Sequence, residues 1–186
     1  MTDELPERAR GAFDAHDAYA AADGEYVIET IAFDGRVTVE DLGPEESDRS
    51  AGTDDRALRY VLTVRAPTLD AAVEEAVGPN LRRGWFETYE IRLEDAPGAV
   101  RADVELEELT VEAVEGEAVA TFVFEFEDAE RAPDVAKALA EYAEGTYVEG
   151  IVPGYTYRPP VSELLARAQQ SGGGGDGGDA GGPMPL

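Results

Sequence analysis

The 186-residue chain contains 41 acidic and 15 basic residues, which gives a formal net charge of −26, and it contains no cysteine. The lack of cysteine excludes disulfides, thiolate metal ligands and cysteine nucleophiles, and the scarcity of basic clusters argues against direct nucleic-acid binding. No apolar stretch approaches the roughly 18 residues of a membrane span, so we expect a cytoplasmic protein without membrane contact. In molar salt the Debye length falls to about 3 Å, so this acidity also predicts a halophilic protein whose self-repulsion is screened.

The first predicted elements are a helix and a β-hairpin. Apolar residues at steps of three or four predict a helix over residues 5–21, which Asp23-Gly24 ends. Residues 25–33 are rich in β-forming side chains and predict a strand. Asp34-Gly35 has the composition of a two-residue hairpin turn, so a second strand should follow it.

The middle of the chain predicts a loop, a strand, a short helix and a further strand. Residues 42–56 are acidic, contain glycine and proline and lack periodicity, so we expect a solvated loop. Alternation of apolar and polar residues from Leu58 predicts a third strand. Thr68 can cap a short helix that closes at Gly78-Pro79, and the shared parity of apolar residues within 85–94 predicts a fourth strand.

The next part of the chain predicts a hairpin and a helix. The apolar residues of 103–114 change parity near Glu107-Glu108, which predicts a fifth strand with a β-bulge. Residues 118–127 alternate around three phenylalanines and predict the sixth strand. Residues 132–144 predict a third helix, with a proline in its first turn and a glycine at its end.

These elements, in the order α-β-β-β-α-β-β-β-α, predict an α+β fold. We expect one domain over residues 1–160, with a twisted antiparallel sheet of about six strands packed with helices. Residues 161–170 predict a short amphipathic helix that must dock either on the same chain or on a second copy. Residues 171–186 contain eight glycines and two prolines and predict a disordered tail.

Side chains that usually perform catalysis are scarce. His16 is the single histidine, and the four serines fall in predicted loops, at a helix start or in the tail, so a catalytic serine-histidine pair is disfavoured. His16, Asp14 and Asp17 are one or two residues apart and cannot converge on one ion from a helix. Lys137 fits a solvated helix position. We therefore assign no catalytic residue, no cofactor and no specific metal site, and we favour a protein that is not an enzyme; a carboxylate-only Mg²⁺ or Ca²⁺ site stays open.

Two segments stand out from the acidic background. Residues 84–93 hold the one tryptophan, and residues 145–157 hold three tyrosines, three glycines and a proline. In a structural interpretation, the aromatic side chains cover an end of the sheet and the glycines permit a tight connection. In a functional interpretation, both segments form a groove that binds a ligand or a peptide. The candidate groove residues are Arg82, Arg83, Trp85, Tyr147, Tyr155 and Tyr157.

Two runs of sequence resemble signature stretches of a small uncharacterised haloarchaeal family, a domain of unknown function. They are Gly-Trp-Phe-Glu-Thr-Tyr-Glu-Ile-Arg-Leu-Glu-Asp-Ala at 84–96 and Glu-Gly-Thr-Tyr-Val-Glu-Gly-Ile-Val-Pro-Gly-Tyr-Thr-Tyr at 144–157. The resemblance covers about residues 5–160. It implies a halophilic origin and brings no catalytic residues.

Two functional hypotheses follow. The first is a non-catalytic domain that binds a protein partner or a second copy of itself, since common nucleophiles and metal ligands are nearly all missing and residues 161–170 need a docking surface. The second is a small-molecule binding protein, or a carboxylate-using enzyme, with its site in the aromatic and glycine groove. A concave pocket lined by these aromatic residues and an arginine would favour the second hypothesis. An exposed apolar patch or a free sheet edge would favour the first.

Overall fold

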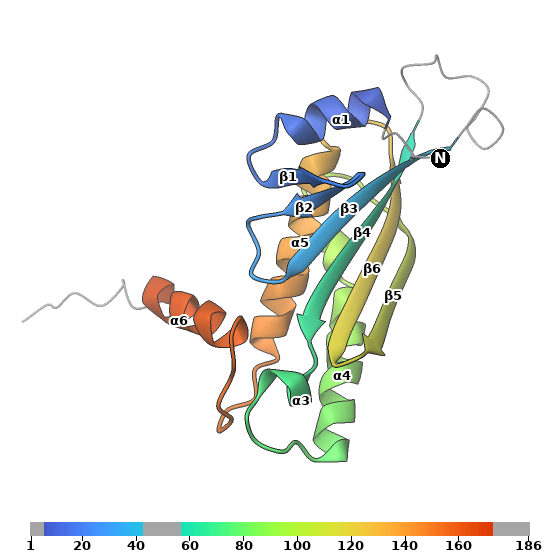
Figure 1. Cartoon of the computed structure of the whole chain (residues 1–186). Helices are drawn as coiled ribbons and strands as arrows, with labels where there is room; N and C mark the ends of the chain where they lie inside the picture. Colours follow the sequence, from blue (N-terminus) through green and yellow to red (C-terminus); the bar gives the residue numbers. More distant parts are fainter. Residues whose placement is uncertain (1–5, 43–56, 173–186) are drawn as a thin grey trace, which may run out of the picture.

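The computed structural model describes residues 6–42 and 57–172, and its centre is one antiparallel sheet in the strand order β1-β2-β3-β4-β6-β5 (Figure 1). The strands are β1 (Tyr19–Ala22), β2 (Glu25–Ile28), β3 (Asp34–Asp41), β4 (Leu58–Pro67), β5 (Leu106–Val114) and β6 (Glu117–Phe126). The helices are α1 (Glu7–Asp14), α3 (Leu69–Ala72), α4 (Pro79–Leu93), α5 (Ala132–Glu149) and α6 (Val161–Gly172), with a 3-10 turn, η1, at Ala96–Ala99. The predicted α+β domain with a six-stranded antiparallel sheet is confirmed. Almost all of the predicted acidic loop and of the predicted tail lies outside the described residues.

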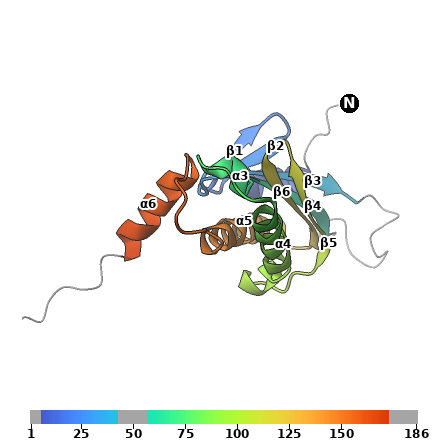
Figure 2. The ribbon, with the colours of Figure 1, turned by 90° about the horizontal axis from the view of Figure 1, so that it is seen from below.

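Helices α4 and α5 pack side by side against one face of the sheet, as Figure 2 shows from below. The central strand β4 explains this arrangement, because its side chains alternate between the two faces. Leu58, Tyr60 and Leu62 point to the helices and are fully buried, whereas Arg59 and Val61 point to the other face and are half-buried. The core therefore lies between the sheet and the α4-α5 pair.

The N-terminal region differs from the sequence prediction. Helix α1 ends at Asp14, so the predicted helix over residues 5–21 is wrong, and β1 follows it. Asp23-Gly24 does not end a helix but makes the hairpin turn between β1 and β2, with φ of 44° and 87°. Positive φ at both central residues is what a two-residue turn of this type requires, and Asp-Gly supplies it.

The predicted hairpin turn at Asp34-Gly35 is also wrong, because both residues belong to β3. Gly35 pairs with Ile28 of β2 and with Val64 of β4. A Cβ atom added at Gly35 would lie 2.8 Å from the side chain of Ile31. Glycine allows close packing against isoleucine side chains here and does not make a turn.

Residues 85–94 form most of helix α4 and not the predicted fourth strand. Its buried residues are Trp85, Tyr89 and Leu93, which follow one another at steps of four and so share one face of a helix. Pro79 stands at the first helical position, where its missing N–H costs no hydrogen bond. Residues at steps of four also share strand parity, which explains the error.

The remaining elements agree more closely with the pattern. The register of β5 against β6 shifts between Leu106 and Glu108, which confirms the predicted bulge. Helix α5 runs through Gly145 to Glu149, so the predicted end at Gly145 is wrong by about one turn. An interior glycine costs a helix only about 1 kcal/mol, which the buried face of α5 can offset.

Helix α6 docks on its own chain by its first turns. Val161 is fully buried and Leu164 is 8% exposed, and both belong to the main hydrophobic core. The rest of the helix projects from the body in Figures 1 and 2. Of the two docking alternatives, the structure shows the intramolecular one, so α6 no longer argues for a partner.

Candidate functional site

The two segments that stand out in the sequence meet where α4 packs against the end of α5. The indole Nε1 of Trp85 donates a hydrogen bond of 3.0 Å to the carbonyl oxygen of Gly150. The Trp85 ring stacks on Tyr89 with centroids 5.6 Å apart, and Tyr147 meets it edge-on at 5.2 Å. Trp85 is 7% exposed and Tyr147 1% exposed. These aromatic rings are part of the core, as the structural interpretation predicts.

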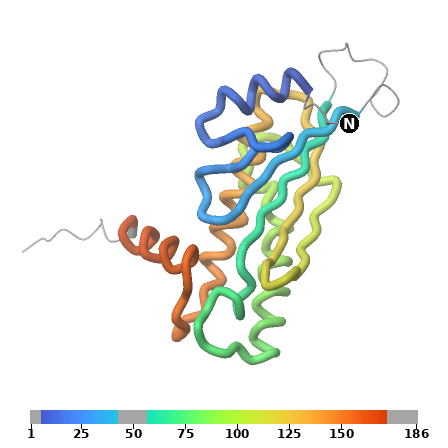
Figure 3. Tube along the Cα trace, viewed as in Figure 1, coloured from blue at the N-terminus to red at the C-terminus, as the bar shows by residue number. Residues whose placement is uncertain are grey.

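Residues 151–158, which we call the strap, fasten the end of α5 to α3 (Figure 3). Within the strap, the hydroxyl of Tyr157 accepts a hydrogen bond of 2.8 Å from the backbone N–H of Val152. Thr156 donates from its backbone N–H and its hydroxyl to the carboxylate of Glu75, which lowers the pKa of that carboxyl. The side chain of Tyr157 therefore stabilises the conformation of the strap.

A narrow groove of about 280 Å³ lies between α4 and the start of the strap. Its floor is Trp85 and Tyr89, and an ion pair of 3.6 Å between Arg92 and Glu149 lies in its wall. The volume is slightly below the usual range of about 300–1,000 Å³ for small-molecule sites. The groove is lined by Leu81, Gly84, Trp85, Thr88, Tyr89, Arg92, Thr146, Glu149, Gly150, Ile151 and Val152.

The six candidate residues from the sequence do not gather in this groove. Trp85 lines it, but Tyr147 lies beneath Trp85 in the core, and the two strap tyrosines do not reach it. Arg82 and Arg83 line a separate depression on the other side of α4. There Arg82 pairs with Asp70 at 3.6 Å, and Arg83 pairs with a glutamate one turn further along α4. The arginine of the groove is Arg92, which sequence reasoning missed because it interpreted 85–94 as a strand.

The hydroxyl of Tyr147 is buried and has no hydrogen-bond partner among the described residues. Burial raises its pKa, and the neighbouring Tyr157 and Tyr89 raise it further. Burial also raises the pKa of Tyr89. Both phenols therefore stay protonated at any physiological pH, and neither is poised as a base.

The outward side of α4 presents an apolar surface to solvent. Within residues 6–42 and 57–172, the exposed large apolar side chains are Leu81 (38%), Ile91 (63%) and Val114 (42%). Leu81 and Ile91 lie on α4 with Gly84 and Thr88 between them, and nothing lies within 4 Å of a Cβ atom added at Gly84. We call Leu81, Gly84, Thr88 and Ile91 the α4 stripe. The spacing of these four residues places them on one side of a helix, but the sequence predicts this only if the segment is interpreted as a helix.

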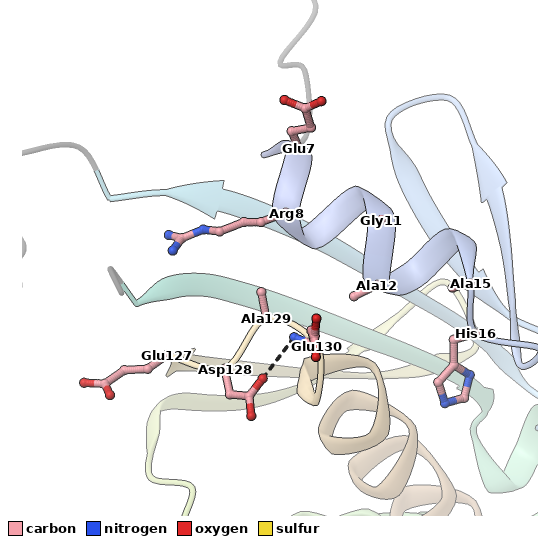
Figure 4. Close-up of a pocket in the computed structure, with 10 residues that line it drawn as sticks. All are labelled: Glu7, Arg8, Gly11, Ala12, Ala15, His16, Glu127, Asp128, Ala129 and Glu130. Carbon is pink, nitrogen blue, oxygen red and sulfur yellow. Dashed lines mark hydrogen bonds between the residues drawn. The ribbon is translucent and has the colours of Figure 1, made fainter. Parts of the chain in front are cut away.

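A hollow of about 850 Å³ lies between α1 and the turn before α5. Figure 4 shows that its charged side chains diverge: Glu7, Arg8 and Glu127 extend away from the hollow, and His16 stands at the opposite end. His16 accepts a hydrogen bond at Nδ1 from the N–H of Ala18, so its Nε2 carries the proton that it donates to Asp134, 3.0 Å away. Among the described residues no three metal-ligating side chains come together. The hollow therefore lacks a converging set of groups for catalysis.

No helix in the described part of the chain is long and apolar enough to cross a membrane. A search of curated proteins gives no match, and a search of solved structures gives none either. A family model, described as a family of unknown function (DUF5813), matches residues 14–167. This range includes the α4 stripe, the groove, the strap and the sheet. The chain therefore belongs to the DUF5813 family of unknown function.

Proposed function

We propose that this protein is a non-catalytic interaction module of a halophilic cytoplasm, and that two copies associate through the α4 stripe. The observation behind the proposal is the exposure of Ile91, 63% of whose surface faces solvent on a well-formed helix. Leu81, also exposed, lies on the same side of that helix. Exposed apolar side chains that cluster on one element are typical of association surfaces.

The stripe is suited to pairing with itself. It contains a large side chain at each end, Leu81 and Ile91, and two small residues, Gly84 and Thr88, in the middle. If two α4 helices cross antiparallel about a two-fold axis, Leu81 of one lies opposite Ile91 of the other, and Gly84 lies opposite Thr88. Each large side chain then occurs twice in one self-complementary surface. The small central residues allow the two helix axes to approach closely.

The local charge also favours α4 as the association surface. Helix α4 contains three arginines and two glutamates, a net charge of +1, in a chain whose net charge is −26. Two such acidic bodies repel one another, and the repulsion is weakest where the facing surfaces are not acidic. Molar salt screens what repulsion is left.

The other candidate surfaces are less suited to binding. Strand β5 is a free sheet edge, but Glu107, Glu108 and Glu112 occupy it, and charged residues discourage strand addition. The groove shares Leu81, Gly84 and Thr88 with the α4 stripe, but in its wall Arg92 and Glu149 pair with each other. A small polar ligand would have to break that pair, so small-molecule binding is the weaker hypothesis.

Sedimentation in molar KCl tests the proposal. We expect a dimer for the natural chain and a folded monomer for Leu81→Glu/Ile91→Glu, with the circular dichroism spectrum unchanged, because both side chains are on the surface. Val114→Glu is the matched control, since Val114 is similarly exposed but lies on β5, and this variant should stay dimeric. A natural chain that is monomeric at every concentration would disprove the proposal, and so would a dimer that survives the double substitution.

Cross-linking tests the antiparallel arrangement, because the chain has no cysteine of its own. A mixture of Gly84→Cys and Thr88→Cys chains should form the mixed disulfide faster than either variant forms its own. A parallel pair would instead favour disulfides between identical variants, which contradicts the proposed register.

A further inference from the structure

We propose that the hollow between η1 and the first half of α5 binds an organic anion, whose carboxylate or phosphate head is held by Arg101 and Arg131. This inference does not depend on self-association, because the hollow and the α4 stripe have no lining residue in common. The hollow measures about 600 Å³ and is bounded by residues 99–102 and by one side of α5. That volume falls within the range of ligand sites.

The side chain of Arg131 reaches the backbone of Arg101, although the two residues are 30 positions apart in the sequence. The guanidinium Nη2 of Arg131 donates a hydrogen bond of 3.5 Å to the backbone carbonyl of Arg101. Both residues line the hollow, and neither forms a salt bridge with a described residue. Arginines elsewhere in the same part of the chain do reach carboxylates, namely Arg36, Arg59, Arg65, Arg82, Arg83 and Arg92. The described residues give these two arginines no carboxylate partner, and we infer that an anion from outside the chain takes that place.

The carboxylates at the rim are already engaged. Asp134 accepts the hydrogen bond from His16 Nε2, and Glu141 pairs with Lys137 one turn before it on α5. Lys137 therefore compensates the charge of Glu141, whereas the hydrogen bond from the neutral His16 orients Asp134 and leaves its charge in place. Neither carboxylate pairs with Arg101 or Arg131. Arg131 also directly precedes the first turn of α5, where the Asp128 carboxylate already accepts hydrogen bonds from the backbone N–H groups of Glu130 and Arg131.

The lining also defines the body of the ligand. Val100, Ala102, Val135 and Ala138 supply apolar surface beside the arginines. A planar guanidinium can bind a carboxylate or a phosphate with two parallel hydrogen bonds. The site therefore fits a compact apolar body with an anionic head, and it discriminates against a neutral molecule of the same shape.

An amide chemical-shift titration of the full chain in molar KCl tests this assignment. The probes are isovalerate for a carboxylate head, isobutyl phosphate for a phosphate head, and isovaleramide as the neutral counterpart. We expect saturable shifts at residues 99–102 and 131–138 with at least one of the two anions, and none with the amide. The stronger anion identifies the head. If neither anion produces saturable shifts, or if the amide binds equally well, the proposal is wrong.

Substitutions of Arg101 and Arg131 test whether these two side chains bind the anionic head. Arg101→Gln and Arg131→Gln should each weaken binding about tenfold or more, because each removes charge-assisted hydrogen bonds to the head. The matched control is Arg82→Gln/Arg83→Gln, which removes two arginines that are already paired and should leave the affinity unchanged. The amide spectrum itself reports that each variant is folded. An equal loss of affinity in the control would show nonspecific attraction and would overturn the site.

Discussion

Both sides of helix α4 contain large apolar side chains, but the two sides serve different purposes. On the inner side Trp85 and Tyr89 are buried against α5, and the one indole N–H is satisfied by Gly150. On the outer side Leu81 and Ile91 stand in solvent on either side of two small residues. Aromatic content attracts attention in a sequence, yet here the aromatic side is structural. The aliphatic side, which has no distinctive composition, is the one that no described part of the chain covers.

The largest effect that tests this comparison is alkaline unfolding. Burial raises the pKa of Tyr89 and Tyr147 on the inner side, and of Tyr19 and Tyr60 elsewhere in the core, above the value of 10.0 for an exposed tyrosine. A folded pKa above the unfolded one means that stability is intact below pH 10 and is lost as the pH rises beyond it. We expect phenolate absorbance from these four residues to appear together with the loss of circular dichroism. If these tyrosines ionised near pH 10 while the protein stayed folded, the burial of Tyr89 and Tyr147 on the inner side of α4 would be contradicted.

A substitution on each side should separate the two roles. Trp85→Ala should lower the free energy of unfolding by about 3–5 kcal/mol, because it empties a packed aromatic site. Ile91→Ala should change it by less than about 0.5 kcal/mol, because that side chain makes few contacts within the chain. Chemical denaturation in molar KCl, at concentrations where the protein is monomeric, measures both. Similar losses of unfolding free energy in Trp85→Ala and Ile91→Ala would contradict the distinction between a structural inner side and a solvent-facing outer side.

The smallest effect concerns a single hydroxyl. Tyr147→Phe removes a buried hydroxyl without a partner, so it should leave the free energy of unfolding unchanged or raise it by up to about 1 kcal/mol. Tyr19→Phe is the matched control, because the Tyr19 hydroxyl donates a hydrogen bond of 2.6 Å to the carbonyl of Pro133. That variant should lose about 1 kcal/mol in the same denaturation experiment. A loss in Tyr147→Phe as large as in the control would show that its hydroxyl has a partner after all.

The sheet was predictable where alternation is strict on a central strand. In β4 the buried residues stay on one parity for the whole strand, and in β5 the change of parity located the bulge. The predicted count of six strands is right only because two errors cancel. Residues 85–94 were counted as a strand and are a helix, while β1 was hidden inside a predicted helix. Alanines at 20–22 favour a helix, and only pairing with β2 makes them a strand.

The candidate sites depend on contacts that no local pattern contains. Sequence reasoning singled out the segments of Trp85 and Tyr147, and the structure brings them together, but which side chains face solvent follows from the packing of α4 on α5. Arg101 and Arg131 belong to different elements and become neighbours only when η1 packs on α5. Acidic residues outnumber basic ones by 41 to 15, which made each arginine worth following, but composition could not say which arginines have no carboxylate partner among the described residues.

The hydrogen bond from Trp85 to Gly150 has a consequence for the order in which the chain is made, because it joins residues 65 positions apart. A ribosome adds about 5–20 residues each second, so α4 exists for roughly 3–13 s before α5 and the strap are available to cover it. During that interval both sides of α4 are uncovered on the nascent chain. Neighbouring nascent chains on one message carry the same helix, and their negative charge is then the main force that keeps them apart until the inner side is buried.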